Sequence, residues 1–269
     1  MKPKIIVIIS SLLFCLFANA QTDLIYKNGM EFVARLNDTG ITWAGEYSSG
    51  NNADCNSTTI TSPQDCSTGR DGNPLTNSNT DGHAGFSFTK LDANGTPLAD
   101  QSVDYVTTPW SCVQDNVTGL IWEVKATDGG LHDNNDRYNW YNTNSATNGG
   151  DDGYADDDGA ICYGYDNLDS STFCNTQAYT SRVNSQGLCG QTDWRMPDIN
   201  ELHSIVHQGK INPTIDASYF PNTVSSYFWS SSPYASSSNG AWELNFGSGY
   251  GGNGGRLSDY NVRLVRGEQ

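Results

Sequence analysis

The stretch Gly187–Leu202, which reads GLCGQTDWRMPDINEL, contains the clearest turn and helix start in the sequence. Asp198 and Glu201 have the spacing of a capping box, in which the Asp side chain accepts from the first turn and the Glu side chain reaches back. Pro197 ends any preceding helix, and Gly209 is a typical residue after a helix end. The sequence therefore predicts a helix from Asp198 to about Gly209. Its buried stripe consists of Ile199, Leu202, Ile205 and Val206.

Short apolar blocks on both sides of this stretch predict strands separated by turns. In Gly119–Lys125 the apolar residues alternate, so that Leu120, Trp122 and Val124 share one face. A second helix is expected over Thr176–Asn184. The other predicted strands are Tyr227–Ser231, Ala241–Phe246 and Val262–Arg266. The tracts Asn148–Gly159 and Gly247–Gly255 offer no apolar face and are expected to be loops.

Residues 21–104 have a different composition, rich in Gly, Asn, Asp, Ser and Thr. Short strands are expected at Phe32–Leu36, Ile41–Trp43 and Phe86–Leu91. A disordered tail is the alternative, but Trp43 and Phe88 favour some burial. The predicted organisation is a signal peptide over 1–20, a loop-rich segment with short strands over 21–104, and a folded domain over 105–269.

The first twenty residues have the pattern of a secretory signal peptide. Lys2 and Lys4 precede an apolar run that ends at Phe17, and Ala18–Ala20 supplies small residues for cleavage before Gln21. No second long apolar stretch follows, so no transmembrane anchor is expected after cleavage. The predicted location is periplasmic, on the cell surface or extracellular.

The mature chain is strongly acidic. Of the 14 Lys and Arg residues, two lie in the signal peptide, which leaves 12 against 30 Asp and Glu and gives a net charge of −18. Such a surface repels phosphate backbones and anionic lipids, so a nucleic-acid partner is excluded. A cation or a neutral or cationic ligand suits this charge.

Six cysteines remain after signal cleavage, and an even number in an exported chain predicts three disulfides. Loop closure favours the pairs Cys55 with Cys66, Cys162 with Cys174, and Cys112 with Cys189, although six cysteines allow 15 pairings. None of the six is spaced as a metal-binding pair. Structural bridges are the expected arrangement.

Several separate motifs, in the same order, resemble the Lcl C-terminal domain family. They are TGLIWE at Thr118–Glu123, the stretch Gly187–Leu202, FPNT at Phe220–Thr223, WSSS at Trp229–Ser232 and VRLVR at Val262–Arg266. The resemblance covers roughly residues 105–269. It implies an exported bacterial domain and surface binding. The sulfated glycans associated with the adhesin that gives the family its name do not fit a chain with so few basic residues.

The pattern also resembles, more distantly, the C-type-lectin-like fold. This resemblance implies an α+β domain with a small twisted antiparallel sheet, two helices and long disulfide-stapled loops. The calcium-dependent lectins of that fold carry Glu-Pro-Asn or Gln-Pro-Asp and a later Trp-Asn-Asp, which are absent here. The sulfatase-modifying enzymes use cysteines near the C-terminus, whereas the last cysteine here is Cys189. Neither chemistry is therefore implied for this chain.

An acidic, glycine-containing loop is the candidate calcium site. Calcium takes six to eight oxygen ligands, and neighbouring carboxylates can share one ion. The alternative is a solvated acidic loop. The candidate ligands are Asp151, Asp152, Asp156, Asp157 and Asp158, and a weaker candidate cluster is Asp133, Asn134, Asn135 and Asp136.

Two other groups of polar residues suggest chemistry but favour structural roles. His203 and His207 are four residues apart on the predicted helix, yet no Glu base follows the first and no third ligand is evident. Asp193, Trp194 and Arg195 are interpreted as a fixed turn. Of Arg263 and Arg266, one is expected to pair with a carboxylate and the other to face solvent.

Aromatic side chains in polar surroundings are the candidate ligand-binding residues, because sugar rings and peptides stack on such faces. The alternative is that they fill the small core. They are Tyr138, Trp140 and Tyr141 beside the acidic loop, and Tyr234 and Tyr250 further along the chain.

The sequence lacks a nucleophile elbow and a phosphate-binding glycine loop, so no catalytic residue is predicted and the protein is not expected to be an enzyme. The leading hypothesis is an adhesion module for glycan or a surface protein, with no certain cofactor and calcium as the candidate ion. The alternatives are a structural subunit of a surface assembly and an enzyme of an unrecognised class.

Overall fold

The computed structural model describes residues 37–46, 50–53, 55, 62–156 and 161–267. The chain divides into two compact units, Met1–Arg35 and Leu36–Gln269, and the described residues belong to the second unit. The predicted signal peptide and the predicted strand Phe32–Leu36 lie outside the described residues. Among those described, no helix has both the length and the apolar character needed to cross a membrane.

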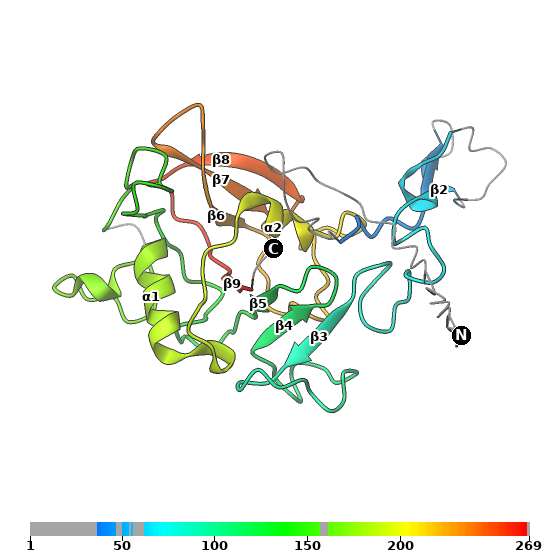
Figure 1. Ribbon diagram of the computed structural model, residues 1–269, viewed down its shortest axis with the longest axis horizontal. Helices are drawn as coiled ribbons and strands as arrows, with labels where there is room; N and C mark the ends of the chain where they lie inside the picture. Colours follow the sequence, from blue (N-terminus) through cyan, green and yellow to red (C-terminus); the bar gives the residue numbers. More distant parts are fainter. Residues whose placement is uncertain (1–36, 47–49, 54, 56–61, 157–160, 268–269) are drawn as a thin grey trace, which may run out of the picture. The chain divides into compact units, whose positions relative to one another are not determined.

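The fold is mixed α+β and contains antiparallel sheets (Figure 1). A four-stranded sheet has the order β3 (Phe88–Leu91), β4 (Cys112–Asp115), β5 (Ile121–Glu123) and β9 (Val265–Arg266). The last strand, drawn red, pairs with β5, drawn green, so Trp122 lies opposite Val265. This pairing joins two of the motifs that resemble the family.

A three-stranded sheet consists of β6 (Tyr227–Pro233), β7 (Gly240–Asn245) and β8 (Tyr250–Gly255). The prediction of a loop over residues 247–255 is wrong for β8, because backbone pairing with β7 makes the strand and needs no apolar face. A two-stranded sheet pairs β1 (Ala44–Glu46) with β2 (Gly50–Ala53), a few residues after the strand predicted at Ile41–Trp43. Among the described residues, three sheets therefore replace the single sheet predicted.

Two α-helices form where they were predicted. α1 (Thr176–Gln186) begins at Asn175, whose side chain accepts from Ala178 N, and ends at Gly187 in the left-handed conformation. α2 (Ile199–Ser204) has the predicted capping box at Asp198. α2 ends earlier than predicted, because the next residues leave helical geometry and enter the core. Three 3-10 turns, η1 (Asp65–Ser67), η2 (Ser170–Thr172) and η3 (Leu188–Gly190), complete the helical elements.

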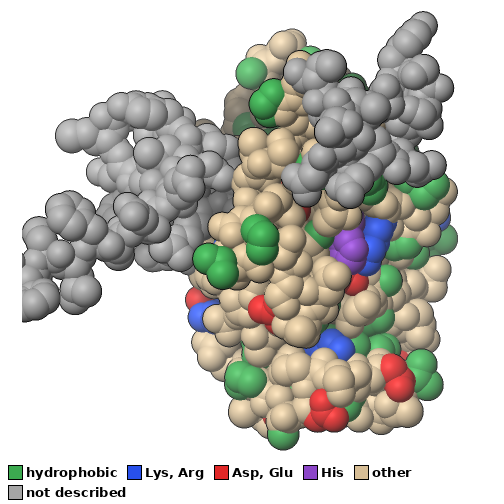
Figure 2. Space-filling view, turned by 90° about the vertical axis from the view of Figure 1, so that its right-hand side faces the viewer, with side chains coloured by type: hydrophobic (Ala, Val, Ile, Leu, Met, Phe, Trp, Pro, Cys, Tyr) green, Lys and Arg blue, Asp and Glu red, His purple; other side chains and the backbone are tan. Residues whose placement is uncertain are grey.

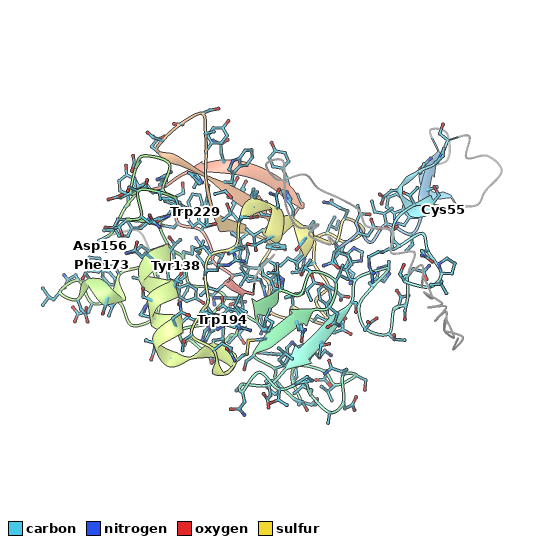
Figure 3. All side chains as sticks on the ribbon, in the orientation of Figure 1. Cys55, Tyr138, Asp156, Phe173, Trp194 and Trp229 are labelled. Carbon is cyan, nitrogen blue, oxygen red and sulfur yellow. A yellow bond between two sulfur atoms is a disulfide. The ribbon has the colours of Figure 1, made fainter. Side chains whose placement is uncertain are left out.

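Two hydrophobic cores lie on opposite sides of β6. Neighbouring strand residues point to opposite faces, so Phe228 enters the first core with Trp122 and Leu244, and Trp229 enters the second with Tyr179. Tyr138 and Trp229, labelled in Figure 3, are both fully buried in the second core. The strand that carries the WSSS motif thus joins both cores.

All three predicted disulfides are confirmed. Cys55 pairs with Cys66, Cys112 with Cys189, and Cys162 with Cys174. The second bridge connects β4 to η3, next to the stretch that predicts α2. β4 itself was not predicted, because it is only four residues long and lies between turns.

A buried polar network connects β5 to α1. The Glu123 carboxylate is fully buried and receives Lys125 Nζ at 3.0 Å, His132 Nδ1 at 2.8 Å and the Tyr179 hydroxyl. Its second oxygen accepts from Leu264 N at 2.9 Å. Burial alone would raise the pKa of Glu123, but the charges and hydrogen bonds of Lys125 and His132 outweigh it and hold the pKa well below its usual range.

Candidate functional site

A shallow groove beside α1 is lined by two of the predicted ligand-binding residues. Its volume is about 200 Å³, and Trp140 and Tyr141 are among its lining residues. The loop that carries them follows β5 in the chain and returns against the start of α1. The other lining residues are Asn142, Thr176, Gln177, Thr180, Ser181, Arg195, Met196 and Ser231.

The loop is fastened to α1 by paired hydrogen bonds. Tyr141 N donates to Thr176 Oγ1 at 3.0 Å, and the Thr176 hydroxyl donates to Tyr141 O at 2.9 Å. Trp140 Nε1 donates to Ser230 O at 2.8 Å, and the Arg256 guanidinium lies 3.9 Å from the centre of the Trp140 ring. These contacts hold the floor of the groove rigid and leave the α1 side chains as its wall.

The groove has little net charge. Arg195 is its only lining residue with a permanent charge, and both its terminal nitrogens contact the Glu201 carboxylate, at 2.7 and 2.6 Å. The hydrogen bonds to Glu201 raise the pKa of Arg195, against the opposing effect of burial. No lining residue carries a carboxylate, an imidazole or a thiol. The groove therefore offers aromatic, amide and hydroxyl groups rather than an acid–base pair.

The predicted aromatic residues occupy different environments. At most 1% of the surface of Tyr138 and Trp140 is exposed, which agrees with the alternative that these residues fill the core. Tyr141 is half-buried in the groove. Tyr234 packs edge-on against Trp242, with ring centres 5.3 Å apart. Tyr250 is 70% exposed at the start of β8. Tyr250 thus belongs to β8 and Tyr234 to the connection between β6 and β7, and neither lines the groove.

A buried glutamate beside Tyr250 was missed by sequence analysis. Glu243 lies opposite Gly252 in the β7–β8 pairing and is only 5% exposed. No hydrogen-bond partner reaches its Oε2 among the described residues. Burial raises the pKa of Glu243 to about 7. Alternation of apolar Trp242, Leu244 and Phe246 predicted the strand but gave no sign that the opposite face is buried.

The raised pKa of Glu243 leads us to expect that the free energy of unfolding depends on pH. Because the folded pKa lies above the usual value, the unfolded chain ionises first as pH rises, and stability falls between about pH 5 and pH 8. Glu243→Gln removes the charge. Because burial of an unpaired ionised group costs roughly 2 kcal/mol of unfolding free energy, this variant should melt about 5 °C higher than the wild type at pH 8. Melting curves at pH 5 should show a smaller difference. Equal differences at both pH values would contradict the prediction.

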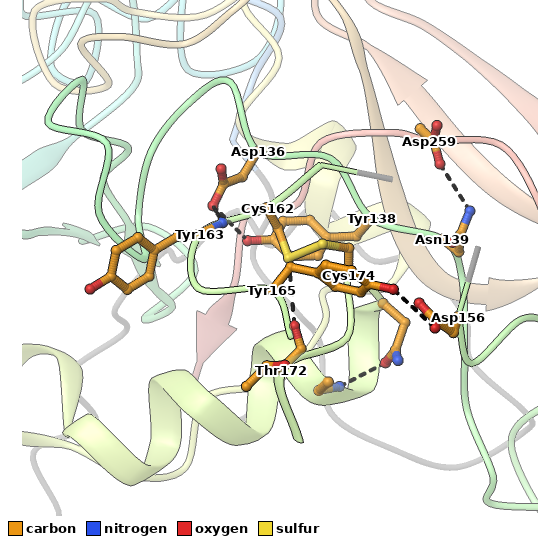
Figure 4. The surroundings of a disulfide bond; sticks show 12 residues. Asp136, Tyr138, Asn139, Asp156, Cys162, Tyr163, Tyr165, Thr172, Cys174 and Asp259 are labelled. Atoms are coloured by element: carbon orange, nitrogen blue, oxygen red, sulfur yellow. Dashed lines mark hydrogen bonds between the residues drawn. A yellow bond between two sulfur atoms is a disulfide. The ribbon is translucent and has the colours of Figure 1, made fainter. Parts of the chain in front are cut away.

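The acidic loop does not bring its described carboxylates together as one site. Asp152 accepts from Asn148 Nδ2 at 2.6 Å, and Asp156 accepts from the Tyr165 hydroxyl at 3.1 Å (Figure 4). Among the described residues, the three carboxylates Asp151, Asp152 and Asp156 form no group of converging metal ligands. Asp157 and Asp158 lie outside the described residues, so calcium binding by this loop stays a prediction.

The weaker acidic cluster is part of the fold. Asp133 Oδ2 accepts from Gly129 N at 2.7 Å. Asp136 Oδ2 accepts from Tyr163 N at 3.0 Å and from the Tyr138 hydroxyl at 3.2 Å, beside the Cys162–Cys174 bridge (Figure 4). Both carboxylates therefore fix turns around the second core.

His203 and His207, predicted to lie on one helix, make different contacts. α2 ends at Ser204, so His207 lies beyond it and contacts His83, with Nε2 and Nδ1 2.7 Å apart. Burial, together with Lys210 and His83, lowers the pKa of His207 to about 4. His203 is exposed and lies against Gly251. The two histidines therefore contact different parts of the fold.

The arginine predictions are confirmed only in part. Arg195 pairs with Glu201, and Arg266 pairs with Asp193 at 2.7 Å, as expected for structural turns. The prediction that the other arginine faces solvent is wrong. Arg263 is fully buried and donates to Glu123 O at 2.6 Å and to the Thr223 hydroxyl at 2.7 Å.

A second, more polar pocket has a volume of about 290 Å³ and was not predicted. His83, Lys90, Lys210 and Asp216 are among its lining residues, with the Lys210–Asp216 pair at 3.1 Å. Lys90 is buried and donates to the backbone oxygens of Gln101 and Val103. Figure 2 shows one face of the protein on which a histidine and a basic side chain lie together within a largely uncharged surface. The charged groups of this pocket are therefore engaged in an ion pair and in hydrogen bonds within the protein.

Comparison with known proteins supports the resemblance seen in the motifs. A comparison with curated proteins and a comparison with solved structures each gave no match. The model of the Lcl C-terminal domain matches residues 111–266, which include β4 to β9, α1, α2 and the groove. The match covers more than half of the chain, and we conclude that the protein belongs to the Lcl C-terminal domain family.

Proposed function

We propose that this protein is an exported binding module and that the groove beside α1 takes a neutral glycan. The observation that carries the proposal is the lining of the groove, in which the half-buried Tyr141 ring lies among amide and hydroxyl groups. Aromatic faces stack on sugar rings, and amides and hydroxyls exchange hydrogen bonds with sugar hydroxyls.

The charge of the groove supports a neutral rather than a sulfated ligand. The guanidinium of Arg195 is engaged by Glu201, and the whole chain has a formal net charge of −16. An anionic polymer would meet long-range repulsion and no free basic cluster in the groove. The absence of an acid–base pair among the lining residues supports binding without catalysis.

Export and the C-type-lectin-like fold belong to the same proposal. Three disulfides favour an oxidising compartment, and the signal-like sequence of residues 1–20 is consistent with it. The mixed α+β architecture, with two helices and a C-terminal strand that returns to pair with β5, is compatible with a C-type-lectin-like domain.

Two exposed serines on α1 allow a matched test. Ser181 lines the groove, whereas Ser185, one turn later, does not. Ser181→Arg should fill the groove and lower glycan affinity at least tenfold, and Ser185→Arg should leave affinity unchanged, with equal melting temperatures for both variants. The measurement is a glycan array with the oxidised mature protein, followed by calorimetry with the best neutral ligand.

The results separate the alternatives. No binding to any neutral glycan on the array, or equal affinity for wild type and Ser181→Arg, would contradict the groove as the site. Retention of a surface filament protein by both serine variants would instead favour the structural-subunit hypothesis.

A further inference from the structure

Three aspartates from the segment before the family domain converge outside the groove. One carboxylate oxygen from each of Asp38, Asp65 and Asp71 lies within 4.8 Å of the other two. Asp65 belongs to η1, directly before Cys66 of the first disulfide, and is exposed. Asp71 is only 3% exposed. The cluster therefore extends from the surface to the interior.

The position of Asp38 is fixed by the domain on one side and by a turn on the other. Asn37 Nδ2 donates to Ser204 O at 3.0 Å, and Gln208 N donates to Thr39 O at 2.8 Å. Asp38 Oδ2 accepts from Arg70 N at 2.5 Å. Gly69 has a φ of 73°, and a Cβ there would collide with Asp38 Oδ2. The turn thus brings the second and third aspartates to the first.

The cluster lacks a cationic partner. In the described part of the chain, no Lys or Arg forms an ion pair with any of the three carboxylates. The nearby Arg70 side chain donates instead to Gly85 O at 2.7 Å. Three carboxylates this close repel one another unless an ion or a proton neutralises them.

A separate observation is the unpartnered oxygen of Asp71. Oδ1 of this buried carboxylate has no hydrogen-bond partner among the described residues, whereas Oδ2 lies 3.2 Å from the Thr39 hydroxyl, which also contacts Asp65 Oδ2. A buried oxygen without a partner normally costs about 1–3 kcal/mol.

We propose that Asp38, Asp65 and Asp71 form a binding site for a divalent hard cation, with calcium as the preferred ion. Calcium takes six to eight oxygen ligands in a flexible geometry, whereas magnesium demands a stricter octahedron and keeps its waters. The three carboxylates and the Thr39 hydroxyl supply the protein oxygens, and the exposed side at Asp65 leaves room for water ligands. Extracellular calcium modules bind with dissociation constants of roughly 10⁻⁴–10⁻³ M.

Thermal unfolding and calorimetry of the oxidised full-length mature protein test the site, without any glycan. After chelator treatment, calcium at about 100 times its dissociation constant should raise the melting temperature by about 5–10 °C. Asp71→Asn and Asp65→Asn should each weaken calcium binding at least tenfold. Because Asp65 is exposed, its substitution is expected to leave the fold intact.

The matched control is Asp156→Asn, which removes the same charge from the acidic loop that the sequence predicts as a calcium site. This variant should bind calcium like the wild type. Loss of the calcium effect in Asp156→Asn, with retention in Asp65→Asn, would overturn the assignment. The assignment would also be overturned if the wild-type protein showed neither heat of binding nor a change in melting temperature up to about 10 mM calcium. This concentration is roughly ten times the largest dissociation constant expected. A larger shift with magnesium than with calcium would overturn the choice of ion.

Discussion

The double variant Cys112→Ala with Cys189→Ala is expected to lose about 4 kcal/mol of unfolding free energy. The two cysteines are 77 residues apart, and the chain-entropy relation gives roughly 4.5 kcal/mol for a loop of this length. Both cysteines are buried in the second core, so native packing also depends on the bridge. Chemical denaturation with circular dichroism measures the loss.

The Cys162–Cys174 bridge supplies the matched comparison. Its sequence separation is 12 residues, and the same relation gives roughly 3 kcal/mol for the corresponding double variant. Both variants exchange two cysteines for two alanines, so the difference of about 1.5 kcal/mol isolates loop length. A smaller loss for Cys112→Ala with Cys189→Ala than for the shorter loop would contradict the entropic argument.

The second large effect is expected at Glu123. Glu123→Ala leaves the buried Lys125 ammonium without its carboxylate and removes the acceptor of the Tyr179 hydroxyl. Breaking a buried ion pair in this way costs about 3–5 kcal/mol. Because the folded pKa of Glu123 is depressed, its stabilisation is present above the unfolded value near pH 4.5 and is lost as pH falls below it.

An exposed ion pair provides the control for this prediction. Asp193 is 59% exposed and pairs with Arg266 at 2.7 Å, so Asp193→Ala should cost about 0–1 kcal/mol. Denaturation curves of both variants at pH 7 and pH 3 measure the contrast. A Glu123→Ala variant as stable as Asp193→Ala at pH 7 would show that the buried network does not support the fold.

Short sequence patterns correctly predicted the elements that depend on interactions between residues close in the sequence. The capping box at Asp198 and the helix near Thr176 depend on residues three or four positions apart, and both are confirmed. The disulfide pairing followed from loop closure. β8 was missed because glycine residues pair through their backbone and give no apolar pattern.

The candidate site was harder to predict because burial depends on tertiary neighbours. Tyr138 and Tyr250 both lie among polar and glycine residues in the sequence, yet one is fully buried and the other is 70% exposed. The convergence of Asp38 with Asp65 and Asp71 joins positions about thirty residues apart. No spacing rule links such positions before the turn at Gly69 is known.

The pairing of β9 with β5 also sets an order of events during biogenesis. The central sheet lacks its fourth strand until residues 265–266 are available to pair with residues 121–122. Contacts of such long sequence separation form slowly, so a chain that is still being synthesised retains an incomplete domain. Under the export that we propose, this delay would keep the polypeptide competent for translocation, and folding and oxidation of the Cys112–Cys189 bridge would follow after translocation.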